Sequence, residues 1–119
     1  MSLRIPQPPR AIAAAMLALA AVSCASNSAK ENSFNAFLQT IAAECRPLII
    51  GSENIGQAIV FNGLGARPEN YNNFLGQTSA LYNGAIPATA YRNSLNNFLG
   101  GGSSNDRSFD CIIAHLPKS

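Results

Sequence analysis

Apolar residues recur every three or four positions in four stretches of the chain, a spacing that predicts amphipathic helices. The first helix is expected to begin at Ser33, which can cap it, and to end before Pro47. The others are expected near residues 69–82, from Pro87 to residue 99, and from residue 105 or 106 to 116. Their apolar faces comprise Phe34, Phe37, Leu38, Ile41, Ala42 and Cys45, then Tyr71, Phe74, Leu75, Leu81 and Tyr82, then Tyr91, Leu95, Phe98 and Leu99, and finally Phe109, Ile112, Ile113 and Leu116. The pattern predicts an all-α domain, a small bundle of four to five short helices.

Residues 48–61, LIIGSENIGQAIVF, leave two structures open. Apolar residues at helical spacing favour a helix, but Gly51 and Gly56 weaken it, and the β-branched residues suit two short strands around GSENIG. We expect a broken helix. The following residues, NGLGARPEN, predict a loop, in which Gly63 and Gly65 alone are a weak indication of a phosphate-binding site.

The tetrapeptide NNFL occurs twice, at residues 72–75 and 96–99, and NAFL at residues 35–38 resembles it. The unequal spacing is not that of a repeat protein. We interpret the tetrapeptide as one packing solution used again, in which the aromatic residue and the leucine point into a common core and the amides face solvent.

Residues 1–23, MSLRIPQPPRAIAAAMLALAAVS, have the order of a secretory signal. Arg4 and Arg10, with no acidic residue, precede a mostly apolar run from Ala11 to Ser23. A membrane-spanning helix needs about 20 apolar residues, and the polar sequence SNSAKENS ends this run too early. We therefore expect an exported protein.

The sequence AVSC at residues 21–24 resembles the cleavage box of bacterial lipoproteins, with Ala21 where leucine is commoner. The resemblance implies that Cys24 is acylated through its sulfur and anchors the protein to a membrane, with residues 24–32 as a polar tether and residues 33–119 as the helical domain. Ala25 is not aspartate, which resembles lipoproteins sorted to the outer membrane of Gram-negative bacteria. The alternative is an ordinary signal cut after Ser23 or Ala25, which would release a soluble periplasmic or secreted protein.

Two cysteines remain once Cys24 is lipidated or removed with the leader. In an exported protein Cys45 and Cys111 are expected to form a disulfide. The bond would place the first and last helices side by side, because bonded cysteines have Cα atoms within about 7 Å.

Charge gives no indication of a nucleic-acid partner. The chain has eight basic and six acidic residues, and loss of Arg4 and Arg10 leaves six of each sign. The remaining basic residues are scattered singly along the sequence, whereas a nucleic-acid interface needs a basic patch.

Candidate catalytic chemistry is sparse. His115, the only histidine, is expected in the last turn of the last helix, where it would interact with the helix dipole. We expect no metal and no cofactor, because a zinc site needs several cysteine or histidine ligands and both mature cysteines are assigned to the disulfide. No G-x-S-x-G motif occurs, and no motif marks a carboxylate pair among Glu44, Glu53, Glu69, Asp106 and Asp110.

Tyrosine and arginine are the residues best suited to anchor a partner, because they combine apolar area with directional donors. The candidate contacts are Tyr71, Tyr82, Tyr91, Arg46, Arg67 and Arg92. The alternative is that the tyrosines belong to the helix core, with their hydroxyls reaching water. The sequence thus favours a non-enzymatic, lipid-anchored interaction or structural module of the cell envelope over a small secreted hydrolase that uses two carboxylates.

Overall fold

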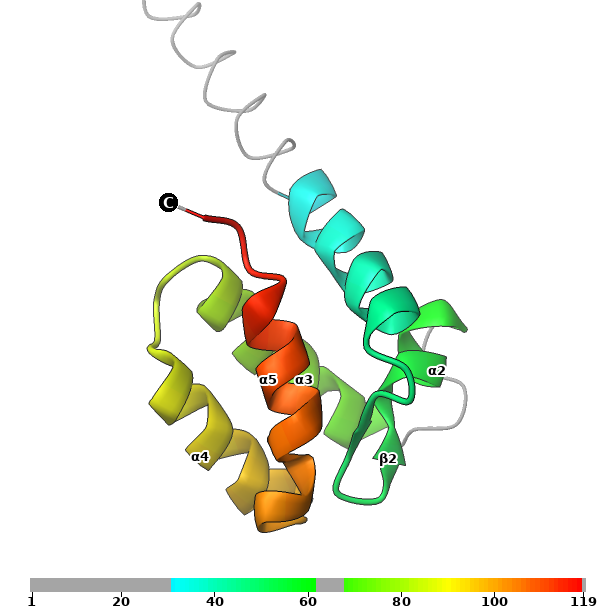
Figure 1. The fold of residues 1–119 in the computed structure, drawn as a ribbon, viewed down its shortest axis with the longest axis vertical. Coiled ribbons are helices and arrows are strands. Elements are labelled where there is room, and N and C mark those ends of the chain that lie inside the picture. Colours follow the sequence, from blue (N-terminus) through cyan, green and yellow to red (C-terminus); the bar gives the residue numbers. More distant parts are fainter. Residues whose placement is uncertain (1–30, 62–67, 119) are drawn as a thin grey trace, which may run out of the picture. The chain divides into compact units, whose positions relative to one another are not determined.

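The computed structural model describes residues 31–61 and 68–118 of the 119-residue chain. The chain divides into two compact units, Met1–Ser33 and Phe34–Ser119, and the second contains nearly all of the described residues. Figure 1 shows its elements. A helix at residues 31–44 is followed by β1 (Ile49–Ile50), β2 (Glu53–Asn54), α2 (Ile55–Val60), α3 (Pro68–Tyr82), α4 (Ala88–Leu99), the 3-10 helix η2 (Gly102–Asn105) and α5 (Asp106–Ala114). The fold is all-α, as predicted, and it also contains one very short hairpin.

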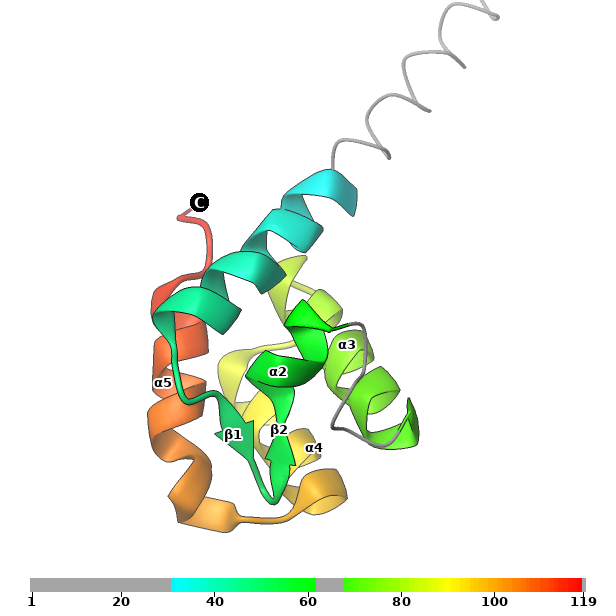
Figure 2. The same cartoon turned by 90° about the vertical axis from the view of Figure 1, so that its right-hand side faces the viewer.

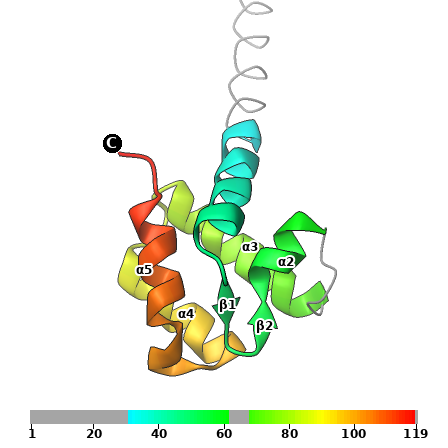
Figure 3. The same ribbon diagram turned by 45° about the vertical axis from the view of Figure 1, so that its right-hand side comes forward.

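A single core joins the helices. α3 and α4 pack against each other, and the hairpin can be followed between α5 and α3 in Figures 2 and 3. Most of the predicted apolar faces are buried here, which confirms the helical spacing as the main folding signal. The buried apolar side chains are Phe37, Leu38, Ile41, Ala42, Cys45, Leu48, Ile50, Ile55, Ala58, Ile59, Phe74, Leu81, Tyr91, Leu95, Phe109 and Ile112.

The expected helix starts differ from the structure at two positions. Ser33 is not a cap, because residues 31 and 32 are already helical and Ser33 is an exposed helix residue. Pro87 is the N-cap residue of α4 and precedes its first turn, with extended backbone angles. Gly84 has a φ of 75° after α3, in the left-handed region in which glycine commonly ends a helix. Residues 62–67, which include most of the expected NGLGARPEN loop, lie outside the described residues.

The expected broken helix at residues 48–61 is wrong in its first half. β1 and β2 form an antiparallel hairpin in which Ile49 pairs with Asn54 and Ile50 with Glu53, and only residues 55–60 are helical. Gly51 makes the turn possible with a φ of 62°, and a Cβ atom there would lie 2.2 Å from the carbonyl oxygen of Leu99. In the first half of this segment, the turn at Gly51 therefore decides the structure, and the helical spacing of the apolar residues does not.

The two NNFL segments do not share a packing solution. Phe74 is fully buried in the core, whereas Phe98 is 42% exposed. The amides were expected to face solvent, but two of them are partly buried. The Oδ1 of Asn73 is buried without a hydrogen bond from the described residues. The Oδ1 of Asn96 accepts a hydrogen bond from Asn105.

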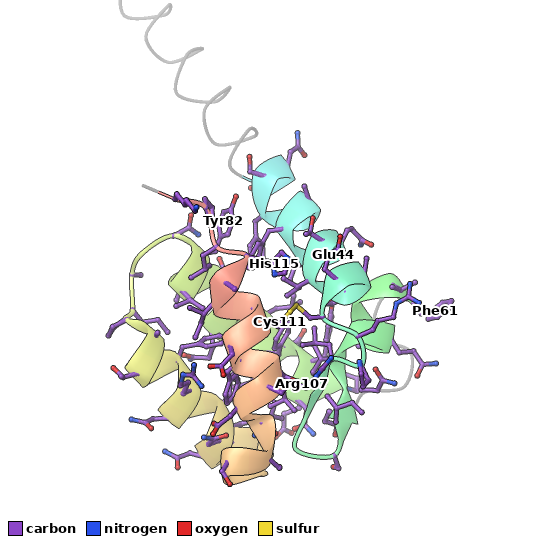
Figure 4. All side chains as sticks on the ribbon, in the orientation of Figure 1. Glu44, Phe61, Tyr82, Arg107, Cys111 and His115 are labelled. Carbon is purple, nitrogen blue, oxygen red and sulfur yellow. A yellow bond between two sulfur atoms is a disulfide. The ribbon has the colours of Figure 1, made fainter. Side chains whose placement is uncertain are left out.

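The disulfide prediction is confirmed. Cys45 and Cys111 are bonded, with Cα atoms 5.8 Å apart. The bond links the end of the helix of residues 31–44 to α5, and Figure 4 shows it between these two elements. The first and last helices of the domain are therefore covalently joined side by side.

A second connection is made by the amide of Asn105, which is 1% exposed. Its Oδ1 accepts a hydrogen bond from the backbone N–H of Gly51 at 2.8 Å. Its Nδ2 donates to the Oδ1 of Asn96 at 2.7 Å and to the carbonyl of Gly100 at 2.8 Å. One side chain thus ties the hairpin turn to the end of α4 and the start of α5.

Candidate functional site

A hollow in the described part of the chain lies between the helix of residues 31–44 and α3. We call it the Tyr71 groove, and its volume is about 890 Å³. None of the lining side chains that the structure describes carries a formal charge, so this surface suits an uncharged segment of a ligand. The groove is lined by Phe34, Asn35, Leu38, Gln39, Ile59, Pro68, Tyr71, Asn72, Leu75, Gly76 and Ser79.

The helical repeat explains how the groove acquires an apolar floor and an amide rim. Phe34 and Leu38 are four residues apart on one face of their helix, and Asn35 and Gln39 follow each of them by one position. Leu38 is buried, while Asn35 and Gln39 are exposed. Amide side chains therefore border the apolar surface, where they can both donate and accept hydrogen bonds.

Of the residues that were predicted to contact a partner, Tyr71 lies in the groove. It is half-buried, and its ring lies 6.3 Å from that of Phe74. Burial raises the pKa of the Tyr71 phenol above its usual value, so the hydroxyl stays protonated and able to donate. The residue offers a ring face and a directional donor together.

The other two tyrosines serve the core. Tyr82 packs against Phe34 and Phe37, with ring centroids 5.4 and 5.0 Å away, and so supports one wall of the groove. Tyr91 is fully buried, and its hydroxyl is 2.8 Å from that of Thr78. The prediction that Tyr91 contacts a partner is wrong, as is the alternative that its hydroxyl reaches water. Burial also raises the pKa of Tyr91.

The two predicted arginines that the structure describes, Arg46 and Arg92, lie in different segments of the fold. Arg92 forms ion pairs with Asp106 and Asp110 and lies 5.7 Å above the ring of Phe109, so it already has partners within the domain. Arg46 is exposed and borders a second hollow, described below. Arg67 lies outside the described residues.

The second hollow has a volume of about 540 Å³ and lies beside α2. Two large apolar side chains border it, Val60 and Phe61, and both are 55% exposed. Figure 4 labels Phe61, which points away from the helices. No prediction from the sequence covered this surface, although the apolar pair Val60 and Phe61 is visible there.

Three of the five candidate carboxylates make hydrogen bonds or ion pairs with neighbouring side chains within the domain, and the other two are exposed. Glu53 is buried, and its Oε1 accepts a hydrogen bond from the Nδ2 of Asn70 at 2.6 Å, which ties the hairpin to the first turn of α3. Asp106 and Asp110 pair with Arg92, while Glu44 and Glu69 are exposed. Among residues 31–61 and 68–118, no described hydrogen bond or ion pair joins two carboxylates.

His115 lies at the C-cap of α5, one position beyond the helix. Its Nδ1 is 2.8 Å from the carbonyl oxygen of Cys111, and because that oxygen can only accept, Nδ1 donates the hydrogen bond. The imidazole also lies next to the disulfide, 3.8 Å from each sulfur.

Comparisons with family models, curated proteins and solved structures found no match to this chain. Among the described residues, every helix is too short or too polar to cross a bilayer. The disulfide is typical of proteins in oxidising compartments.

Proposed function

We propose that this chain is a lipid-anchored, non-enzymatic interaction module of the cell envelope, and that its Tyr71 groove binds a segment of another envelope protein. The anchor rests on the AVSC sequence at Cys24 and on the polar tether that follows it. The disulfide supports export, because it forms and persists in an oxidising compartment.

The observation that carries the docking proposal is the composition of the groove. Its floor is apolar, through side chains such as Leu38 and Leu75, and its rim carries amides and the Tyr71 phenol. An amide both donates and accepts a hydrogen bond, which is what a peptide backbone requires from a binding surface. The lining residues within 31–61 and 68–118 carry no formal charge, which disfavours a strongly charged ligand, because burying a charge without a partner is costly.

The occupant that fits is a protein segment with apolar side chains and accessible backbone amides. The half-buried aromatic ring of Tyr71 provides the kind of anchor found at the centre of protein interfaces. The domain would thus present a binding surface from the membrane, with specificity set by shape and hydrogen bonds.

Site-specific photo-crosslinking in cells tests this proposal. A photoreactive amino acid replaces Gln39, in the groove rim, or Asn97, an exposed residue of α4. We expect a discrete product from position 39 only, joined to an apolar, uncharged segment of one envelope protein. Asn72→Arg in the same chain should abolish that product, because it places a long, charged side chain in the groove.

Asn93→Arg is the matched control, since it makes the same substitution at an exposed position of α4. It should leave the product at position 39 unchanged. The proposal fails if position 97 gives the same product as position 39, or if Asn72→Arg leaves the product intact while circular dichroism shows a folded domain.

A further inference from the structure

A histidine and two cysteines meet where the first and last helices are joined. The Nδ1 of His115 is 3.8 Å from the sulfur of Cys45 and 3.8 Å from that of Cys111. One ligand atom from each of the three residues can be chosen so that all lie within 4.8 Å of one another. Figure 4 shows His115 beyond Cys111 on α5, with the disulfide reaching the helix that ends at Glu44.

We propose that Cys45, Cys111 and His115 form a latent site for a thiophilic cation such as Zn²⁺, which becomes available when a dithiol reduces the disulfide. Thiolate and imidazole are the ligands that Zn²⁺ prefers in proteins. The donor set is therefore that of a zinc site, apart from the bond that now joins the two sulfurs.

The separations of the ligand atoms suit tetrahedral coordination. Zn–S and Zn–N bonds of ordinary length place a thiolate sulfur and an imidazole nitrogen about 3.6 Å apart, and two thiolate sulfurs about 3.8 Å apart. The sulfur–nitrogen distances of 3.8 Å are already close to this value. Only the two sulfurs must separate, by rotation of side chains on Cα atoms that are 5.8 Å apart.

The reaction that opens the site is a two-electron exchange. The dithiol supplies two electrons and two protons and becomes a disulfide, while the Cys45–Cys111 bond breaks to give two thiols. Binding of Zn²⁺ then releases both thiol protons to water, so that two thiolates balance the two charges of the ion. The imidazole binds in its neutral form.

The position of each ligand allows a cation to enter from solvent. Cys45 is buried, Cys111 is partly buried and His115 is exposed. The Nδ1 of His115 now donates to the carbonyl oxygen of Cys111, so coordination through Nδ1 requires its proton to move to Nε2. A water molecule would complete the four ligands, as in zinc sites with three protein ligands.

Cobalt is a suitable probe, because Co²⁺ takes the same ligands and its bonds to thiolate give a charge-transfer absorption band. The full chain, purified from membranes in detergent, is compared in oxidised and reduced form, with a phosphine as the laboratory reductant under anaerobic conditions. We expect a thiolate–cobalt band that saturates at one ion per reduced chain and is displaced by Zn²⁺. The oxidised chain should give no such band.

His115→Asn tests the third ligand and leaves both cysteines in place. Replacing a group that only orients a metal ligand already weakens binding about 10–100-fold, so loss of the imidazole should weaken Zn²⁺ binding at least tenfold in competition with a chromophoric chelator. Asn83→Ala, an exposed substitution in the turn after α3, is the control and should leave the affinity unchanged.

Circular dichroism distinguishes a folded site from two loose thiols. If reduction lowers the helix content, Zn²⁺ should restore it in the native sequence, because binding then contributes to folding. The proposal is overturned if the reduced chain gives no thiolate–cobalt band, if His115→Asn binds Zn²⁺ as tightly as the native sequence, or if denaturant leaves the affinity unchanged.

Discussion

Asn105→Ala tests the polar connection between the hairpin and the helices. The native amide accepts from the N–H of Gly51 and donates to Asn96 and to the carbonyl of Gly100. Alanine removes all three hydrogen bonds and introduces no new charge. The backbone of the hairpin turn then loses the partner that fixes it to the start of α5.

The expected loss in the free energy of unfolding depends on how exposed each group is that loses its hydrogen bond. The N–H of Gly51 is partly buried, and a donor left unsatisfied away from water costs about 1–3 kcal/mol. Asn96 and Gly100 are nearer to solvent and lose only the net value of a hydrogen bond, about 0.5–1.5 kcal/mol each. We expect the free energy of unfolding to fall by about 2–6 kcal/mol, a large part of the total for a small domain.

Urea unfolding with the disulfide intact, followed by circular dichroism, measures this loss. Asn97→Ala is the matched control, because Asn97 is exposed on α4 and a surface substitution of this kind changes stability by about 0.5 kcal/mol or less. Amide hydrogen exchange should show protection of Gly51 in the native sequence and its loss in Asn105→Ala. If Asn105→Ala and Asn97→Ala have equal stability, the proposed connection does not contribute to the fold.

Two further predictions concern the cysteines. Cys24→Ser should move the protein from the membrane fraction to the soluble fraction, because it removes the acceptor of the lipid; a native protein that is already soluble and begins at another residue would contradict the anchor. Cys111→Ser opens a loop whose ends are 66 residues apart, and the chain-entropy relation gives a loss of about 4 kcal/mol in the free energy of unfolding. Urea unfolding measures it, and mass spectrometry without reductant should find the Cys45 and Cys111 peptides linked only in the native sequence.

The helices could be predicted because each has a continuous apolar face of helical period. Phe74 and Leu81 in α3, and Phe109 and Ile112 in α5, are buried as the spacing requires. The spacing of each face is local, so the sequence alone contains it. The disulfide could be predicted for another reason, because Cys45 and Cys111 are the two cysteines left in a chain expected to be exported.

The hairpin and the polar connection depend on contacts between distant segments. The turn at Gly51 fits only because the carbonyl of Leu99 lies where a side chain would otherwise project. Asn105 is an ordinary polar residue in the sequence, and its burial follows from the meeting of three segments. The same reason explains Tyr91, whose hydroxyl is satisfied by Thr78 of α3 and not by water.

The groove itself was not predicted from the sequence, and among its lining residues only Tyr71 was named as a candidate partner contact. Its two walls come from the helix of residues 31–44 and from α3, and no sequence pattern states that these helices lie side by side. The amides of Asn35 and Gln39 are spaced four residues apart, which places them on one face, but an exposed amide pair is common on any surface helix. These two amides form part of a groove only because α3 lies across from them.

One helix carries both the groove wall and the disulfide, yet the two features are held by different contacts. Near its start, Phe34 and Phe37 pack against Tyr82 of α3; at its end, Cys45 is bonded to α5. Breaking the disulfide removes the second attachment and leaves the aromatic contacts that hold the wall of the groove. Cys111→Ser should therefore lower stability while the folded fraction still crosslinks through position 39, whereas Asn72→Arg should abolish the crosslink in a stable domain. Loss of the crosslink in a folded Cys111→Ser protein would mean that the groove depends on the disulfide for its shape.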